Sequence, residues 1–224
     1  MKLNKRVITV GLIIFALAFV GKLLWTGLKN IKIDEFHPAA VMFVIDSSAS
    51  NQKSLPEQKK LLRQICNLLD PEDKIKIFRV SEDAYLIYEG TPMNGSGITK
   101  AMDAFTKYDK NDYGTAYGIG MKKAFSYALS MKKEGYNPAV VVIGDLENEG
   151  DVSKQINWQT LPSNVSNVKK YAPEISMMFL GAHPAKLDMV KEKLNPVLGE
   201  TKLIVAPEQN TDKAIRNFLH ALGR

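Results

Sequence analysis

Short apolar runs alternate with longer amphipathic segments along most of the chain. Residues 40–45 and 139–143 are apolar without regular polar alternation, a pattern typical of strands buried on both faces of a sheet. Two further runs, at residues 175–180 and 202–205, have the composition of strands. Strands that alternate with helix-length segments predict an α/β domain, in which helices cover a doubly wound, mostly parallel sheet.

Two strands near the start of this domain lie too close together for a helical crossover. They are predicted at residues 74–80 and 85–88, so we expect them to pair antiparallel at one edge of the sheet. The polar stretch at residues 147–173 is expected to hold a helix or turns above the C-terminal edge of the sheet. Helices are predicted at residues 56–69, 98–108, 115–133, 186–194 and 211–222.

A basic segment and an apolar run precede the domain. Lys2, Lys5 and Arg6 come before an apolar run at residues 7–21, which continues to residue 28 if Lys22 places its amine among lipid headgroups. Signal peptides share this pattern, but no small-x-small cleavage site follows the run, so we expect a retained transmembrane helix. The expected organisation is a basic segment at 1–6, a transmembrane anchor at 7–28, a linker at 29–37 and one domain at 38–224.

Basic residues on the two sides of the apolar run nearly balance. Lys22, Lys29 and Lys32 lie within or after it, so the charge bias specifies its orientation only weakly. We expect the N-terminus in the cytoplasm and the folded domain on the outer side of a bacterial-type inner membrane. The opposite orientation, with a cytoplasmic domain, stays open.

The positive charge of the chain belongs to its first 33 residues. The formal net charge is +6, and this segment holds six Lys or Arg and no acid, which leaves 24 basic and 24 acidic residues afterwards. A neutral domain without a stripe of basic and aromatic residues argues against a nucleic-acid partner. The excess charge instead flanks the apolar run, where anionic lipid headgroups would attract it.

Cys66 is the only cysteine of the chain, which excludes an intramolecular disulfide. Leu62, Ile65 and Leu69 place it on the apolar side of a predicted helix. We therefore expect it to pack in the core and not to act as a reactive or metal-binding thiol.

Polar side chains follow three of the predicted elements. Asp46-Ser-Ser-Ala-Ser50 comes after the first buried strand, Thr115 opens a long helix, and Asp145 comes after the second buried strand. In open α/β sheets, ligands collect outside the C-terminal ends of the strands. The three segments therefore define a candidate site, and they supply oxygen ligands only.

This order of residues resembles the metal-ion-dependent adhesion site (MIDAS) of von Willebrand factor A (VWA) domains. The resemblance covers nearly all of residues 38–224 and includes the early antiparallel strand pair. It implies a Rossmann-like VWA fold, and it implies that serine hydroxyls, and in some states the threonine, bind the metal directly while the two aspartates often act through water. The metal-binding residues implied by the resemblance are Asp46, Ser48, Ser50, Thr115 and Asp145.

The donor types are consistent with a small, hard dication. Mg²⁺ prefers octahedral oxygen, retains water and commonly uses one or two protein carboxylates, the number that Asp46 and Asp145 provide. We expect Mg²⁺, with Mn²⁺ or Ca²⁺ as alternatives. Because two carboxylates roughly neutralise the ion, the resemblance implies that a partner protein supplies an Asp or Glu carboxylate as a further ligand.

Two residues beside Asp145 depart from the family pattern. Leu146 stands where the family often has glycine, so the local turn is open to change. Glu147 could approach the metal, which would make the site more anionic and favour retention of the ion over recruitment of a partner carboxylate.

The same residues can also be explained without a metal, as helix caps and loop residues. Ser50, Asn51 or Thr115 could cap the helices that follow them, and Asp145 could be a solvated loop residue. Caps do not require the three segments to converge, whereas a metal site does.

We consider three functions for the chain. The leading hypothesis is a non-enzymatic, membrane-anchored VWA domain that binds proteins or assembles a complex through a divalent metal. The second is the same fold as a metal-free structural subunit of a membrane complex, motivated by Leu146. The third is a metal-dependent phosphoesterase with Asp46 as nucleophile, which would lack its usual second acid because position 48 is serine. The sequence holds no Gly-rich phosphate loop, serine-nucleophile elbow or His-Glu-x-x-His motif.

Overall fold

The computed structural model describes residues 37–49, 51–104, 114–207 and 211–224. The expected transmembrane anchor at residues 7–28 and the expected ligand Ser50 lie outside these ranges. Within them, no helix combines the length and the apolar character needed to cross a bilayer.

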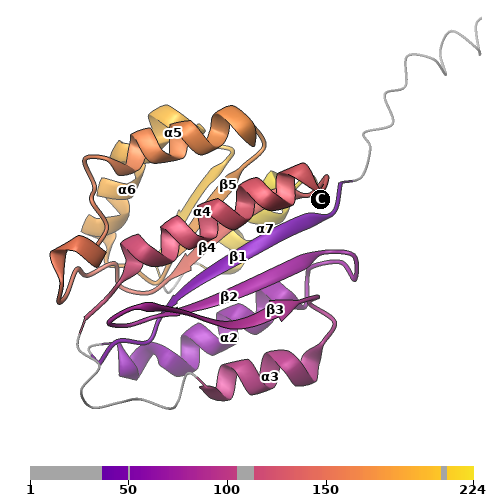
Figure 1. Cartoon of the computed structure of the whole chain (residues 1–224), viewed down its shortest axis with the longest axis horizontal. Coiled ribbons are helices and arrows are strands. Elements are labelled where there is room, and N and C mark those ends of the chain that lie inside the picture. The colour runs from indigo at the N-terminus through magenta and orange to yellow at the C-terminus, as the bar shows by residue number, and fades with distance from the viewer. Residues whose placement is uncertain (1–36, 50, 105–113, 208–210) are drawn as a thin grey trace, which may run out of the picture. The chain divides into compact units, whose positions relative to one another are not determined.

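Six strands form one sheet in the spatial order β3-β2-β1-β4-β5-β6 (Figure 1). Neighbouring strands are parallel except β2 and β3, which are antiparallel. The predicted α/β class and the antiparallel edge pair are therefore confirmed. The strands are β1 (Ala39–Asp46), β2 (Lys74–Val80), β3 (Ala84–Gly90), β4 (Asn137–Ile143), β5 (Ser176–Leu180) and β6 (Leu203–Ala206).

Helices cover both faces of the sheet. One face packs against α4 (Tyr117–Lys133), α5 (Leu161–Tyr171) and α6 (Pro184–Leu198). The other packs against α2 (Leu55–Cys66), α3 (Gly95–Ala104) and α7 (Thr211–Ala221). Two short 3-10 helices, η1 (Gln52–Ser54) and η2 (Val152–Lys154), lie in loops at the C-terminal end of the parallel strands.

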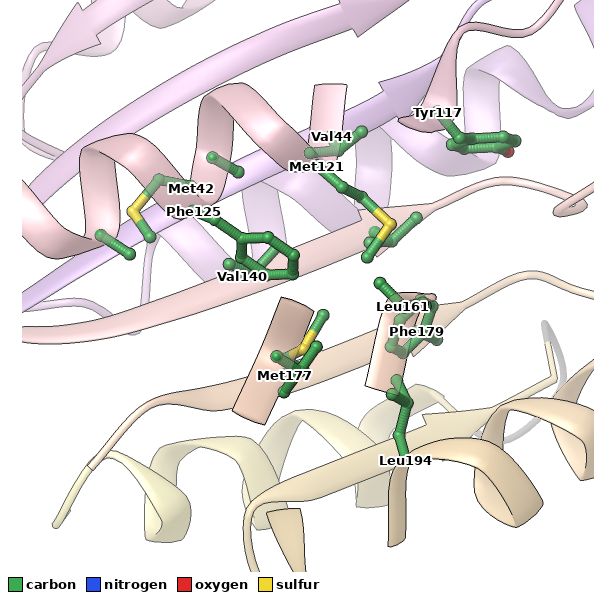
Figure 2. Close-up of a cluster of buried hydrophobic side chains, with 14 of the residues drawn as sticks. Met42, Val44, Tyr117, Met121, Phe125, Val140, Leu161, Met177, Phe179 and Leu194 are labelled. Carbon is green, nitrogen blue, oxygen red and sulfur yellow. The ribbon is translucent and has the colours of Figure 1, made fainter. Parts of the chain in front are cut away.

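The central strand β1 is buried along its whole length. Met42 and Val44 belong to the core beneath α4, which Figure 2 shows together with Phe125, while Phe43 and Ile45 belong to the core on the opposite face. Because successive side chains of a strand point to opposite faces and both faces are covered, β1 needs no polar alternation. This explains the unbroken apolar run in the sequence.

Some element boundaries differ from the predicted ones. The long helix predicted from residue 115 begins at Tyr117, so Thr115 stays in the preceding loop. The polar stretch at residues 147–173 contains η2 and α5. Cys66 of α2 packs in the hydrophobic core, as expected. Burial raises the pKa of its thiol to about 12.

Candidate metal centre

The C-terminal ends of β1 and β4 bring two predicted carboxylates together. Ile45 of β1 pairs with Ile143 of β4, so Asp46 lies beside Gly144, which Asp145 follows. A Cβ added to Gly144 would lie 2.6 Å from the Asp46 Cβ, so the two loops approach closely only because residue 144 is glycine. The two carboxylates are near enough for the charge of Asp145 to raise the pKa of Asp46.

The Asp46 carboxylate is fully buried and accepts hydrogen bonds on both of its oxygens. The Ser48 amide donates to Oδ1 at 2.7 Å, while Asn51 Nδ2 and the Tyr117 hydroxyl each donate to Oδ2 at 3.0 Å. Burial raises the pKa of Asp46 to about 6, the hydrogen bonds from Ser48 lower it, and the charge of Asp145 raises it. These donors are neutral, so a cation beside this carboxylate would stabilise its ionised form.

The Thr115 hydroxyl is buried and has no hydrogen-bond partner among the described residues. The Thr115 amide donates to the Glu149 carbonyl at 3.0 Å, and the Ala116 amide donates to the Ser81 carbonyl at 2.7 Å, so the backbone here is fixed. Ala116, not Thr115, occupies the N-cap position of α4, and it makes no side-chain capping bond. The helix-cap interpretation of Thr115 is therefore wrong, and its unpaired oxygen suits a metal ligand.

Asn51 does not cap α2 either. The N-cap residue of α2 is Ser54, which makes no side-chain capping bond, and Asn51 uses its side-chain amide on Asp46 instead. Ser48 is fully buried two residues after Asp46. Ser50 lies outside the described residues, so its place in the site stays a prediction.

The loop after β4 retains a tight turn although residue 146 is not glycine. Asp145 accepts a hydrogen bond from the Glu147 amide at 2.8 Å. Leu146 adopts a left-handed backbone conformation with φ of 61°, and its side chain is buried in the core beneath α4. The Glu147 carboxylate pairs with Lys186 of α6 at 3.0 Å, which directs it toward that helix.

Tyr117 is a site residue that the sequence interpretation missed. Its hydroxyl donates to Asp46 and accepts a hydrogen bond from the Leu146 amide at 3.3 Å. The side chain is fully buried, and burial together with the charges of Asp46 and Asp145 raises its pKa well above the ordinary value. In the sequence, an aromatic residue at the start of an amphipathic helix indicates a core position. Only its place two residues after Thr115 could have suggested a role in the site.

The side chains at this end of the sheet fit a divalent cation held by few carboxylates. Asp46 and Asp145 provide two negative charges, and Ser48 and Thr115 provide hydroxyl oxygens. The part of the chain that the structure describes contains no group of three or more His, Cys, Asp or Glu side chains arranged to hold a metal. The candidate donor set therefore depends on hydroxyl and water oxygens, which Mg²⁺ accepts.

A family model supports the domain type. The model for the von Willebrand factor type A domain matches residues 41–148, a range that includes every candidate ligand. No curated protein matches the sequence.

Solved structures share the fold at low sequence identity. BatB from Bacteroides thetaiotaomicron is 14% identical, with a TM-score of 0.59, over 83% of this chain and 100% of that one. An aerotolerance-related membrane protein from Bacteroides fragilis is 17% identical, with a TM-score of 0.52, over 83% and 98% of the two chains. Proximal thread matrix protein 1 from the mussel byssus, solved with a zinc-occupied MIDAS motif, is 17% identical over 83% of this chain and 46% of that chain, with a TM-score of 0.55.

Proposed function

We propose that this chain, which carries a von Willebrand factor type A domain, binds a divalent cation and uses it to hold a protein partner. The proposed ion is Mg²⁺, with Mn²⁺ or Ca²⁺ as alternatives. The observation that carries the proposal is the buried Thr115 hydroxyl, which lacks a partner among the described residues and lies at the same end of the sheet as both carboxylates. The proposed ligands are Asp46, Ser48, Ser50, Thr115 and Asp145.

The charges of these residues indicate the kind of partner. Asp46 and Asp145 together nearly balance a dication, and hydroxyls and water add no charge. A carboxylate from an Asp or Glu of the partner would therefore meet a site that is not already strongly anionic. Glu147 does not change this balance, because its carboxylate pairs with Lys186.

The proposed role is binding and not catalysis. VWA domains are typically interaction modules. Asp46, the nucleophile of the phosphoesterase alternative, is fully buried, and both of its oxygens already accept hydrogen bonds. A carboxylate held in this way is poorly placed to attack a phosphate ester.

We also propose that the domain is held at a membrane by residues 7–28 and faces the extracytoplasmic side. The apolar run and its flanking basic residues support this location. The similarity in fold to an aerotolerance-related membrane protein is consistent with it. Within the described domain, the chain enters β1 at residue 39, at the end of the sheet opposite the proposed metal site.

Calorimetric titration of the full-length chain, kept in mild detergent, with Mg²⁺ and Mn²⁺ tests the metal site. We expect one site per chain that Asp46→Ala abolishes and Asp145→Ala weakens. Asp188→Ala, which removes an exposed carboxylate on α6, is the matched control and should bind like the wild type. Absence of binding, or equal binding by Asp46→Ala, would contradict the proposal.

A metal-free structural role is a second candidate, because neutral protein donors already satisfy the Asp46 carboxylate. In that case a chelator and Asp145→Ala would leave the recovery of bound proteins unchanged. If the metal mediates binding, both treatments should reduce that recovery.

A further inference from the structure

One buried hydroxyl connects the loops that carry the two candidate carboxylates. Tyr117 Oη donates to Asp46 Oδ2 at 3.0 Å and accepts from the Leu146 amide at 3.3 Å, linking positions 71 and 29 residues away in the sequence. Tyr117 is also the first residue of α4, two positions after Thr115. Its side chain therefore contacts the loop after β1 and the loop after β4, and it belongs to the segment that places Thr115.

The hydroxyl lies close against Gly144. A Cβ added to Gly144 would lie 2.0 Å from Tyr117 Oη, far inside van der Waals contact. Figure 2 shows the Tyr117 ring at the margin of the apolar core beneath α4. The ring packs against this core, while the hydroxyl contacts the loops after β1 and β4. A hydrogen bond between two fixed elements can hold a metal ligand in one orientation.

The Leu146 amide depends on this hydroxyl. Leu146 has a φ of 61°, a conformation that L-residues adopt at a cost, and its side chain is buried. The Leu146 amide donates to Tyr117 Oη, so this hydrogen bond, the Glu147–Asp145 hydrogen bond and the buried Leu146 side chain together hold the turn. Asp145 lies between this residue and Gly144, which packs against Tyr117 and Asp46.

We propose that Tyr117 is a positioning residue for the metal site, because its hydroxyl fixes the carboxylates of Asp46 and Asp145 relative to each other. The inference rests on the proposed metal-binding function. Tyr117 does not bind the ion itself. Hydrogen bonds that orient metal ligands typically change metal affinity by about 10- to 100-fold when they are removed.

Tyr117→Phe tests this role, because it removes one oxygen and keeps the ring that packs against Gly144 and the core. Tyr127→Phe is the control, since it makes the same chemical change in the same helix at a half-buried residue whose ring faces Lys76. Mn²⁺ alone is the probe. Its affinity is measured by calorimetry on the full-length chain, and the electron paramagnetic resonance spectrum of the bound ion reports its ligand geometry.

We expect Tyr117→Phe to bind Mn²⁺ at least about tenfold more weakly and to give a changed spectrum at saturation, with Tyr127→Phe like the wild type. Circular dichroism in the presence of chelator establishes that each variant is folded. If Tyr117→Phe is only less stable, and keeps the wild-type affinity and spectrum at temperatures where it is folded, the inference is overturned and the proposed function stands. If the wild type itself binds no Mn²⁺, the proposed function and this inference are both overturned.

Discussion

At the scale of single residues, two buried polar groups determine the chemistry of the site. Asp46 is a carboxylate that accepts hydrogen bonds from neutral donors, and Thr115 has a hydroxyl without a partner among the described residues. Each group costs stability when it is buried in this form. One cation between them would offset both costs, so the same residues that weaken the metal-free protein are suited to bind an ion.

Thr115→Val separates these two effects, because valine keeps the shape of threonine and removes its oxygen. In chelator, we expect the free energy of unfolding to stay the same or to rise by up to about 1 kcal/mol. The Mn²⁺ affinity should fall at least about tenfold. Urea unfolding and calorimetry measure the two quantities.

Ser176→Ala provides the control for Thr115→Val. The Ser176 hydroxyl is also buried without a partner among the described residues, but it lies at the start of β5, at the opposite end of the sheet. This variant should leave the Mn²⁺ affinity unchanged. Wild-type affinity in Thr115→Val would show that its hydroxyl is not a ligand.

The raised pKa of Asp46 predicts a pH dependence of stability. Its pKa is about 6 in the folded protein against an ordinary value of 3.8, so the folded state binds the proton more tightly than the unfolded state does. Stability in chelator should therefore fall as pH rises from about 4 to 6, by roughly 2 to 3 kcal/mol from this group.

Comparison with Asp46→Asn isolates this contribution. The variant cannot ionise at position 46, so its stability should depend less on pH over the same interval, as measured by urea unfolding at several pH values. Equal slopes in the two proteins would mean that burial of Asp46 does not shift its pKa. Added Mg²⁺ should stabilise the wild type most above pH 6, where the carboxylate is ionised.

Part of the site could be predicted from the sequence, and part could not. Asp46 and Asp145 lie at the ends of β1 and β4, which parallel strands bring to one edge, and Thr115 lies just before α4. Tyr117 gave no comparable signal, because its role depends on hydrogen bonds to residues 71 and 29 positions away. Leu146 was singled out as a departure that left the turn open to change, but its positive φ could not be predicted because leucine does not favour that conformation.

At the scale of elements, the end of β4 is the tightest part of the site. Gly144 has a φ of 152°, and an added Cβ would clash with Tyr117 Oη and the Asp46 Cβ. Gly135, in the turn between α4 and β4, has a φ of 91° and nothing within 4 Å of an added Cβ. Both glycines have a positive φ, but only Gly144 is crowded. Alanine substitutions at the two positions therefore separate the cost of crowding from the cost of backbone strain.

We expect Gly144→Ala to destabilise the protein by about 3 kcal/mol, because a side chain there forces the loops apart. Gly135→Ala should cost only about 1 kcal/mol, from backbone strain. Thermal and urea unfolding measure both. Similar costs for the two variants would contradict the close packing of Gly144 against Tyr117.

The elements themselves were largely predictable, for a physical reason. Strands β1 and β4 are buried on both faces, so their apolar runs stand out from the surrounding sequence. Helix α4 begins two residues after its predicted start, because Ala116 at its N-cap makes no side-chain capping bond and backbone hydrogen bonds to Glu149 and Ser81 fix the loop before it. Contacts of that kind leave no local sequence pattern.

At the scale of the whole domain, a buried ion pair joins distant parts of the chain. Arg224 donates to both oxygens of Asp73, which is fully buried and also accepts the Ala39 amide at 2.7 Å. Arg224 also pairs with Asp70 at 3.0 Å. The segment after α7 is thus tied to the start of β1 and to the turn before β2, at the end of the sheet opposite the proposed metal site.

Arg224→Ala should destabilise the domain by about 3 kcal/mol, because it leaves the Asp73 carboxylate buried without its cation. Lys60→Ala removes an exposed ion pair with Glu57 and should cost less than about 1 kcal/mol. Urea unfolding compares the two. Since Asp73 is remote from the metal site, a loss of Mn²⁺ affinity in folded Arg224→Ala would contradict this separation of stability from binding.

The central claim is that the end of the sheet formed by Asp46, Thr115 and Asp145 holds a divalent cation. A crystal structure of the protein grown with Mn²⁺, with anomalous diffraction data, tests it most directly. We predict an anomalous peak within about 2.5 Å of Thr115 Oγ1 and beside both carboxylates. No peak there, with the loops ordered and Mn²⁺ in excess, would contradict the account.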